Sequence, residues 1–209
     1  VRNAQDGIGA IQTAEAGLNE IRNMVLRIRE LAVQMANGIY ENTPDRANAQ
    51  LEVTALLNQV DLISSNTDFN DIALLDGTFS AVTIQAGNTT AETISISFAD
   101  VGQSGLSITG ASIATQASAT TVIGTMDSAI ETIATQQATM GSLINRLNFS
   151  VANLSKASVM TEQAIGRVMD ADFAQETTNL SKQQILNQAA TSMLAQANQA
   201  KQSILALLQ

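Results

Sequence analysis

The sequence predicts a mainly α-helical protein: an elongated, coiled-coil-like three-helix rod with a small β-hairpin region and a C-terminal helical extension. Three observations predict this fold. In three long segments the apolar residues recur at alternating steps of three and four, a pattern called the seam here, which is typical of helices packed lengthwise. A Ser-, Thr- and Gly-rich stretch separates the second segment from the third. The last segment, Phe173 to Gln209, contains no glycine or proline.

Composition excludes several classes of function. The net charge of -9 argues against nucleic acid and against anionic membranes as partners. No run of eighteen or more apolar residues occurs, so we expect no membrane span. The chain has no cysteine and no histidine, which removes thiolate metal sites, the commonest general base and the commonest transition-metal ligand. We therefore expect no catalytic residues, no metal and no cofactor.

The first helix is expected over residues 8–36, because eight apolar residues follow the seam there. Gly38 is expected to end this helix in a left-handed cap, the conformation that glycine adopts most easily. The seam consists of Ile11, Ala14, Leu18, Ile21, Val25, Ile28, Ala32 and Met35.

A second helix is expected over residues 44–64, and with the first it forms an antiparallel hairpin. Thr43 offers an N-cap hydroxyl, Pro44 suits the first helical position, and Asp45 complements the positive end of the helix dipole. Its seam consists of Ala49, Val53, Leu56, Val60 and Ile63.

Residues 65–125 are expected to form a β-hairpin and an irregular region at the far end of the rod. Residues 79–85 and 93–98 alternate β-branched and polar side chains around a loop, which indicates two paired strands. Three glycines between residues 100 and 121 favour irregular structure. Asp68, Asp71 and Asp76 are interpreted as turn and cap residues.

A third helix is expected over residues 126–168. Its seam consists of Met126, Ile130, Ile133, Met140, Ile144, Leu147, Val151, Leu154, Ile165 and Val168. Gly141 and Gly166 interrupt it at a cost of about 1 kcal/mol each relative to alanine. They either allow close approach of another helix, with a joint at Gly166, or are tolerated without a role.

Residues 170–209 are expected to form a further helix after a joint near Asp170. Its apolar residues lie on several sides, and no charge occurs between Gln183 and Ala200, so the helix requires partners on several sides. We expect those partners to be other subunits, a segment that would precede Val1, or both. Nearby Asp170, Asp172 and Glu176 are interpreted as helix caps rather than a cation site. The apolar residues assigned to polymerisation are Leu180, Ile185, Leu186, Met193, Leu194, Leu207 and Leu208.

Both ends of the chain carry specific motifs. The front contains Asn3-Ala4-Gln5-Asp6-Gly7-Ile8, Leu26-Arg27-Ile28-Arg29-Glu30-Leu31-Ala32-Val33-Gln34 and Asn66-Thr67-Asp68-Phe69-Asn70. The rear contains Arg167-Val168-Met169-Asp170-Ala171-Asp172-Phe173-Ala174 and Met193-Leu194-Ala195-Gln196-Ala197-Asn198-Gln199. With these motifs the chain resembles the bacterial flagellins, the subunits of the flagellar filament.

The resemblance implies a rod domain over residues 1–169 and an inner-tube helix over residues 170–209. In the family that helix pairs with an N-terminal segment of about fifty residues, which this chain is expected to lack. It also implies a secreted subunit at the cell surface that self-assembles into a filament for motility. The implied partners are other flagellin subunits, an export chaperone, and the hook-junction and cap proteins.

An alternative from another class is a flagellin-like surface adhesin that binds host or polysaccharide ligands through residues 65–125. Deletion of Thr78 to Phe98 is expected to separate the two hypotheses: filament formation should survive the deletion, whereas adhesion should not.

The resemblance also singles out Arg27, Leu31 and Glu52. They match the positions through which an animal Toll-like receptor grips flagellin, on a surface that also packs between filament subunits. Arg27 and Leu31 share one helical face and lie off the seam. Alternatively, Leu31 widens the core and Arg27 only solvates the rod.

Overall fold

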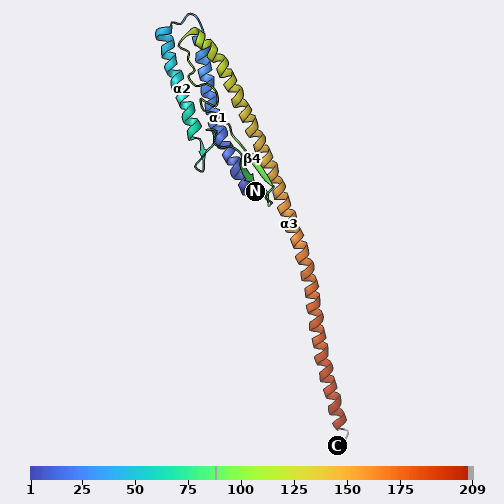
Figure 1. Cartoon of the computed structure of the whole chain (residues 1–209). Helices are drawn as coiled ribbons and strands as arrows, with labels where there is room; N and C mark the ends of the chain where they lie inside the picture. Colours follow the sequence, from blue (N-terminus) through green and yellow to red (C-terminus); the bar gives the residue numbers. More distant parts are fainter. Residues whose placement is uncertain (88, 207–209) are drawn as a thin grey trace. The chain divides into compact units, whose positions relative to one another are not determined.

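The structure, a computed structural model, describes residues 1–87 and 89–206 and is mainly helical (Figure 1). Its helices are α1 (Arg2–Met35), the single π-helical turn η1 (Asn42–Arg46), α2 (Ala47–Asn66) and α3 (Gln116–Ala206). Contacts divide the chain into a first unit, Val1–Ser155, and a second unit, Lys156–Gln209. Helix α3 therefore contributes to both units.

The first unit is built on helices α1, α2 and the first part of α3, which lie side by side in Figure 1. Helix α3 runs antiparallel to α1. Asp127 accepts a hydrogen bond from Arg29 at 2.5 Å, and Gln137 donates one to Asn19 at 2.7 Å. Further along, Leu147 approaches Gly7. The prediction that the third helix packs lengthwise on the others is thus confirmed for its contact with α1.

The apolar seam of α1 forms the centre of the core. All eight predicted residues are buried, from Ile11 to Met35. In α2, Val53 and Val60 are buried, and the other three predicted seam residues pack against the core while partly exposed. The three-four spacing therefore identified the buried faces of both helices.

The turn between α1 and α2 differs from the prediction. Helix α1 ends at Met35, and Gly38 does not adopt a left-handed conformation. The ends of the turn are held instead by Arg46, whose guanidinium donates to the carbonyls of Met35 at 2.9 Å, of Asn37 at 2.8 Å and of Tyr40. The side chain of Arg46 thus takes the place of the expected glycine cap. Its guanidinium carries several N–H donors, and these satisfy backbone carbonyls that the end of a helix leaves without a partner.

Two small antiparallel hairpins follow α2. Strands β3 (Val82–Gln85) and β4 (Thr93–Ile96) pair as predicted, although each is shorter than expected. Strands β1 (Asp68–Phe69) and β2 (Ile72–Ala73) form a second pair that the sequence did not predict. Their two-residue turn places Asn70 and Asp71 at positive φ, which Asn and Asp tolerate.

Asp76 also occupies a turn, as predicted. Its carboxylate accepts hydrogen bonds from the hydroxyl of Thr78 at 2.6 Å and from the Thr78 backbone N–H at 3.0 Å. These bonds hold the pKa of Asp76 below its ordinary value. The stabilisation is therefore present at neutral pH and is lost as the pH falls through the folded-state pKa.

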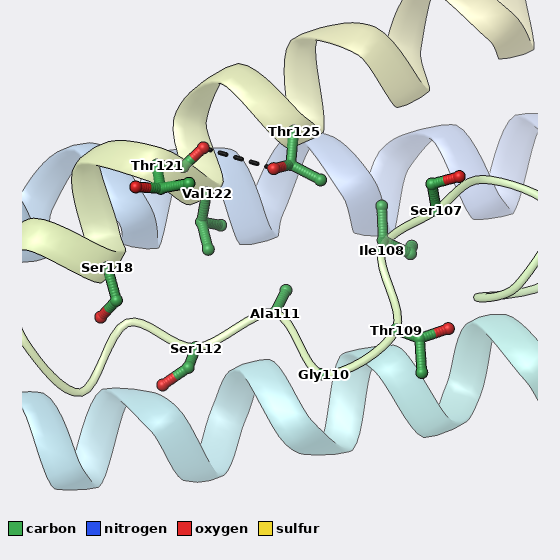
Figure 2. Close-up of a pocket in the computed structure, with 10 residues that line it drawn as sticks. All are labelled: Ser107, Ile108, Thr109, Gly110, Ala111, Ser112, Ser118, Thr121, Val122 and Thr125. Carbon is green, nitrogen blue, oxygen red and sulfur yellow. Dashed lines mark hydrogen bonds between the residues drawn. The ribbon is translucent and has the colours of Figure 1, made fainter.

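The middle region is not confined to the far end of the rod. Ser64 donates to the carbonyl of Leu75, Asp61 accepts from the backbone N–H of Gln103, and Gln50 accepts from that of Ile113. The chain after β4 therefore returns along α2 toward the α1–α2 turn. Figure 2 shows part of this return, residues 107–112, running between α2 and α3.

The irregular segment also supplies part of the core, through Val101, Leu106, Ile108 and Ile113. Phe79 and Phe98 are buried and stack with their ring centroids 5.0 Å apart. Deletion of Thr78 to Phe98 would remove both rings, so that deletion does not separate adhesion from assembly cleanly.

Helix α3 begins at Gln116, ten residues before the predicted start at residue 126. Thr115 and Ser118 form a reciprocal cap: the Thr115 hydroxyl accepts from the N–H of Ser118 at 3.2 Å, and the Ser118 hydroxyl accepts from that of Thr115 at 3.1 Å. Ala119 and Val122 are buried on the same three-four spacing as Met126. The early turns were missed because their Ser, Thr and Gly content suggests a loop, and packing overrides that propensity.

The second unit consists of the remainder of α3, and the helix continues without a break through residue 170. The predicted joint near Asp170 is therefore wrong. Asp170 and Glu176 lie inside a helix and cap no helix end, and the side chain of Asp172 lies outside the described part of the chain. The predicted seam is buried or partly buried as far as Leu154, whereas Ile165 and Val168 are exposed. The functional division at residue 169 stays a prediction.

Two helical glycines give a matched stability prediction. A Cβ at Gly141 would meet no atom within 4 Å, so the idea of close helix approach there is wrong. A Cβ at Gly17 would lie 2.7 Å from the hydroxyl of Thr67 and 3.0 Å from Leu75. We expect Gly141→Ala to stabilise the first unit by about 1 kcal/mol and Gly17→Ala to destabilise it by at least as much. Thermal unfolding followed by circular dichroism measures the change in unfolding temperature of each variant. Equal shifts of the unfolding temperature would contradict the assignment of Gly17 to a close contact and of Gly141 to an open position.

Candidate functional site

The second unit carries a surface that is apolar and exposed. Leu180, Ile185, Leu186, Met193 and Leu194 are each more than half exposed. The remaining two predicted polymerisation residues, Leu207 and Leu208, lie outside the described residues. Exposure of so many large apolar side chains on one helix is uncommon on a soluble monomer and marks an interaction surface.

The local sequence explains why this segment is helical without a hydrophobic core of its own. Residues 183–200 are mostly Ala, Gln, Leu and Met, which favour helices, and they contain no glycine, proline or charge. Further toward the N-terminus, Thr161, Ala164, Ile165, Val168 and Met169 line a shallow apolar groove. Backbone propensity therefore forms the helix, and burial of its side chains requires other molecules.

A second candidate site lies on the first unit, where Arg27 and Glu52 meet. The guanidinium Nε of Arg27 donates to Glu52 Oε1 at 2.8 Å, and its Nη1 donates to Glu30 Oε2 at 3.4 Å. The hydrogen bond and charge of Glu52, with a smaller contribution from Glu30, raise the pKa of Arg27. Both Arg27 and Glu52 are nearly half exposed, so the pair links α1 to α2 while remaining accessible.

Leu31 does not share that accessibility. Its side chain is only 4% exposed and belongs to the core. Of the two interpretations of Leu31, the structure favours the one in which it widens the core edge. Leu31 lies off the seam because the seam describes packing of a helix against one partner. Helix α1 is instead covered by α2, α3 and the middle segment.

The middle region contains an open pocket of about 340 Å³ between the returning segment and the start of α3 (Figure 2). Its lining includes Ile108 and Val122 below a rim of Ser and Thr hydroxyls, and one of these, Thr125, donates to the carbonyl of Thr121. None of its described lining residues is ionisable. The pocket therefore offers neither a general acid or base nor a charged anchor.

Among the side chains that the structure describes, those of residues 1–87, 89–170 and 173–201, no three carboxylates come together in a group that could hold a metal ion. In the described part of the chain, no helix contains an apolar stretch that could span a membrane. The site that stands out is the exposed apolar helix. A helical unit with its own core, followed along the chain by such a helix, is typical of a structural protein that assembles with copies of itself.

Comparison with known proteins agrees with that class. Residues 1–80 match the bacterial flagellin N-terminal helical region, and residues 123–208 match the bacterial flagellin C-terminal helical region. Flagellin FlaB2 of Treponema pallidum is 40% identical over 99% of this chain and 77% of its own length. The flagellin of Bacillus subtilis is 35% identical over 99% of this chain and 79% of its own. The crystal structure of Bacillus cereus flagellin is 34% identical, with a TM-score of 0.66 over 73% of this chain and 88% of that one.

The chain belongs to the bacterial flagellin family. It is a structural subunit of the flagellar filament that is exported and self-assembles with other flagellin subunits outside the cell, and it is not an enzyme. The resemblance, the fold class and the structural function predicted from the sequence are thereby confirmed. No comparison favours the adhesin alternative.

Proposed function

We propose that the exposed apolar surface of α3 between Leu180 and Leu194 is the polymerisation surface of this subunit. Residues 170–209 then form the inner-tube helix, and residues 1–169 form the rod domain. The observation that supports this assignment is the exposure of Leu180, Ile185, Leu186, Met193 and Leu194 on a helix that has no core of its own.

Burial of these side chains between subunits supplies the driving force for assembly. Full burial of one leucine or methionine side chain contributes about 1.5–3 kcal/mol, so full burial of five such side chains contributes on the order of 10 kcal/mol. Much of that gain is offset by ordering and immobilising each subunit. The subunit consequently stays monomeric until it meets a filament end that covers several of its apolar sides at once.

Truncation after Asn179 tests the proposal. Purified natural subunits and truncated subunits are added separately to short filament seeds, and elongation is measured by electron microscopy. We expect the truncated subunit not to elongate seeds, while its first unit keeps the unfolding temperature of the parent because the contacts of that unit are intact. Normal elongation of seeds by the truncated subunit would show that the polymerisation surface does not lie on this part of α3.

Further partners follow from the same exposure. An export chaperone is proposed to cover the apolar sides of α3 before assembly, since an uncharged helix with exposed leucines is otherwise prone to association. Hook-junction and cap proteins are proposed to contact the subunit at the two ends of the filament. Hydrogen exchange of residues 180–200 with and without the chaperone measures the first of these contacts, and unchanged exchange would contradict it.

Recognition by a Toll-like receptor is proposed for the exposed Arg27–Glu52 pair, with the buried Leu31 supporting α1 from the core side. The pair also suits packing between subunits, since both side chains are accessible. Buried arginines at protein interfaces commonly contribute more than 1 kcal/mol to binding.

Arg27→Ala is expected to reduce receptor signalling by about tenfold, the change that a loss of about 1.4 kcal/mol produces. The matched control is Arg29→Ala, which removes an arginine that pairs with Asp127 instead. Both variants should fold normally, because exposed ion pairs contribute less than about 1 kcal/mol. Potency is measured as the half-maximal dose of purified subunit on receptor-bearing cells; equal potency of the two variants would contradict the assignment.

A further inference from the structure

The seven methionines divide sharply between the two units. In the first unit Met35, Met126 and Met140 are buried, and Met24 is partly buried against the core. In the second unit Met160, Met169 and Met193 are 66–72% exposed. The sulfur atoms that solvent can reach freely are therefore those of the second unit.

One of the exposed methionines, Met193, lies among the residues assigned to assembly, and a second, Met169, lies in the apolar groove that precedes them along α3. Met169 lines the apolar groove together with Ile165 and Val168. Met193 follows Leu186 by seven residues, or two helical turns, so the two side chains occupy the same side of the helix. A polar group introduced at either sulfur would appear in the middle of an apolar surface.

A two-electron oxidant such as hydrogen peroxide performs that change. The thioether sulfur attacks one peroxide oxygen; an S–O bond forms, the O–O bond breaks, and the remaining oxygen leaves as water. Sulfur is oxidised and the peroxide is reduced. The product, methionine sulfoxide, is polar, and reductases convert it back to methionine.

We propose that Met160, Met169 and Met193 form an oxidant-sensitive modification site: sulfoxide formation on the free subunit blocks assembly, and assembly shields the same sulfurs. The inference rests on the proposed polymerisation role of α3. A sulfoxide buried between subunits without a hydrogen-bond donor weakens each contact. The core of the first unit is unaffected under the same exposure, because Met35, Met126 and Met140 react only when that core opens.

The first test compares oxidation of free subunits and of filaments by dilute hydrogen peroxide, with sulfoxide at each methionine quantified by peptide mass spectrometry. In free subunits we expect Met160, Met169 and Met193 to react at least about tenfold faster than Met35, Met126 and Met140. In filaments we expect Met160, Met169 and Met193 to react at least about tenfold more slowly than in free subunits. Equal rates in subunits and filaments would overturn the shielding.

The second test adds oxidised subunits to filament seeds. The control is a triple variant, Met160→Leu, Met169→Leu and Met193→Leu, in which leucine preserves volume and helix propensity but cannot be oxidised. We expect oxidation to raise the concentration needed for elongation by about tenfold or more in the natural subunit and to leave the triple variant unchanged. Loss of elongation by the oxidised triple variant would overturn the proposal, since the damage would lie elsewhere.

A Leu186→Asp subunit separates failure of this inference from failure of the proposed function. If oxidised natural subunits elongate seeds normally while Leu186→Asp subunits do not, the proposed modification site is wrong and the proposed polymerisation surface is supported. If oxidised natural subunits and Leu186→Asp subunits both elongate seeds normally, the proposed polymerisation surface is wrong as well. The shielding measurement uses only the natural subunit, so it is decisive even where the triple variant assembles poorly.

Discussion

Subunits that carry Leu186→Asp and Leu194→Asp together are expected to lose filament elongation while their first unit stays folded. Both leucines are more than half exposed in the chain, so a carboxylate at either position is solvated in the free subunit. In the filament the same carboxylates would be buried without partners, at a penalty of several kcal/mol each. That penalty exceeds the gain from burying the leucines that they replace.

Elongation of seeds by electron microscopy measures the effect, and circular dichroism checks the helical content of the subunit. The matched control is Leu186→Met with Leu194→Met, which preserves apolar character and approximate volume and should elongate seeds nearly as well as the parent. Normal filaments from the double aspartate variant would refute the assignment of this surface to subunit contacts.

Arg46→Leu is expected to lower the stability of the first unit by about 3 kcal/mol. The Arg46 side chain is only 3% exposed, and its guanidinium satisfies three backbone carbonyls of the α1–α2 turn and the side-chain oxygen of Asn42 at 3.0 Å. Leucine fills part of the space but leaves these acceptors without donors. For a unit of this size the loss corresponds to a fall of roughly 10 °C in the unfolding temperature.

Two controls isolate the role of the arginine fork. Arg22→Leu removes an exposed arginine from α1 and should change the unfolding temperature by little. Arg46→Lys keeps the charge, but a single ammonium group cannot donate to carbonyls on both sides of the turn as the planar guanidinium does. This variant should therefore recover less than half of the stability that Arg46→Leu loses. Similar unfolding temperatures for Arg46→Leu and Arg22→Leu would show that the turn does not depend on Arg46.

The sequence predicted the parts of the fold that depend on periodic burial. The seam of α1 identified every one of its eight residues correctly, because a helix that packs lengthwise must repeat its apolar side chains every three or four positions. The β3–β4 hairpin was predicted for a similar reason, since alternation along a strand is visible in a single sequence.

The parts that were missed depend on long-range contacts. No local pattern indicates that residues 100–115 return along α2, because that path is set by pairs such as Gln50 with Ile113 and Asp61 with Gln103. The burial of Arg46 is equally nonlocal, since it depends on carbonyls of the preceding turn. A capping signal was available at Thr115 and Ser118 and would have corrected the start of α3.

The candidate site was predicted in part. An uncharged, leucine-bearing helix without a seam identified the exposed surface of the second unit, because composition alone shows that such a helix lacks a core. The pairing of Arg27 with Glu52 joins two helices and was suggested only by resemblance. Burial of Leu31 could not be foreseen, since its cover comes from several elements at once.

Hydrogen exchange of the natural subunit, free and in the filament, tests the central claim most directly. In the free subunit the backbone amides of residues 180–200 should exchange rapidly, because an isolated helix without packing opens easily. In the filament the same amides should become strongly protected, while the core of α1 is protected in both states. Unchanged, rapid exchange of residues 180–200 in intact filaments would contradict the assignment of α3 as the polymerisation surface.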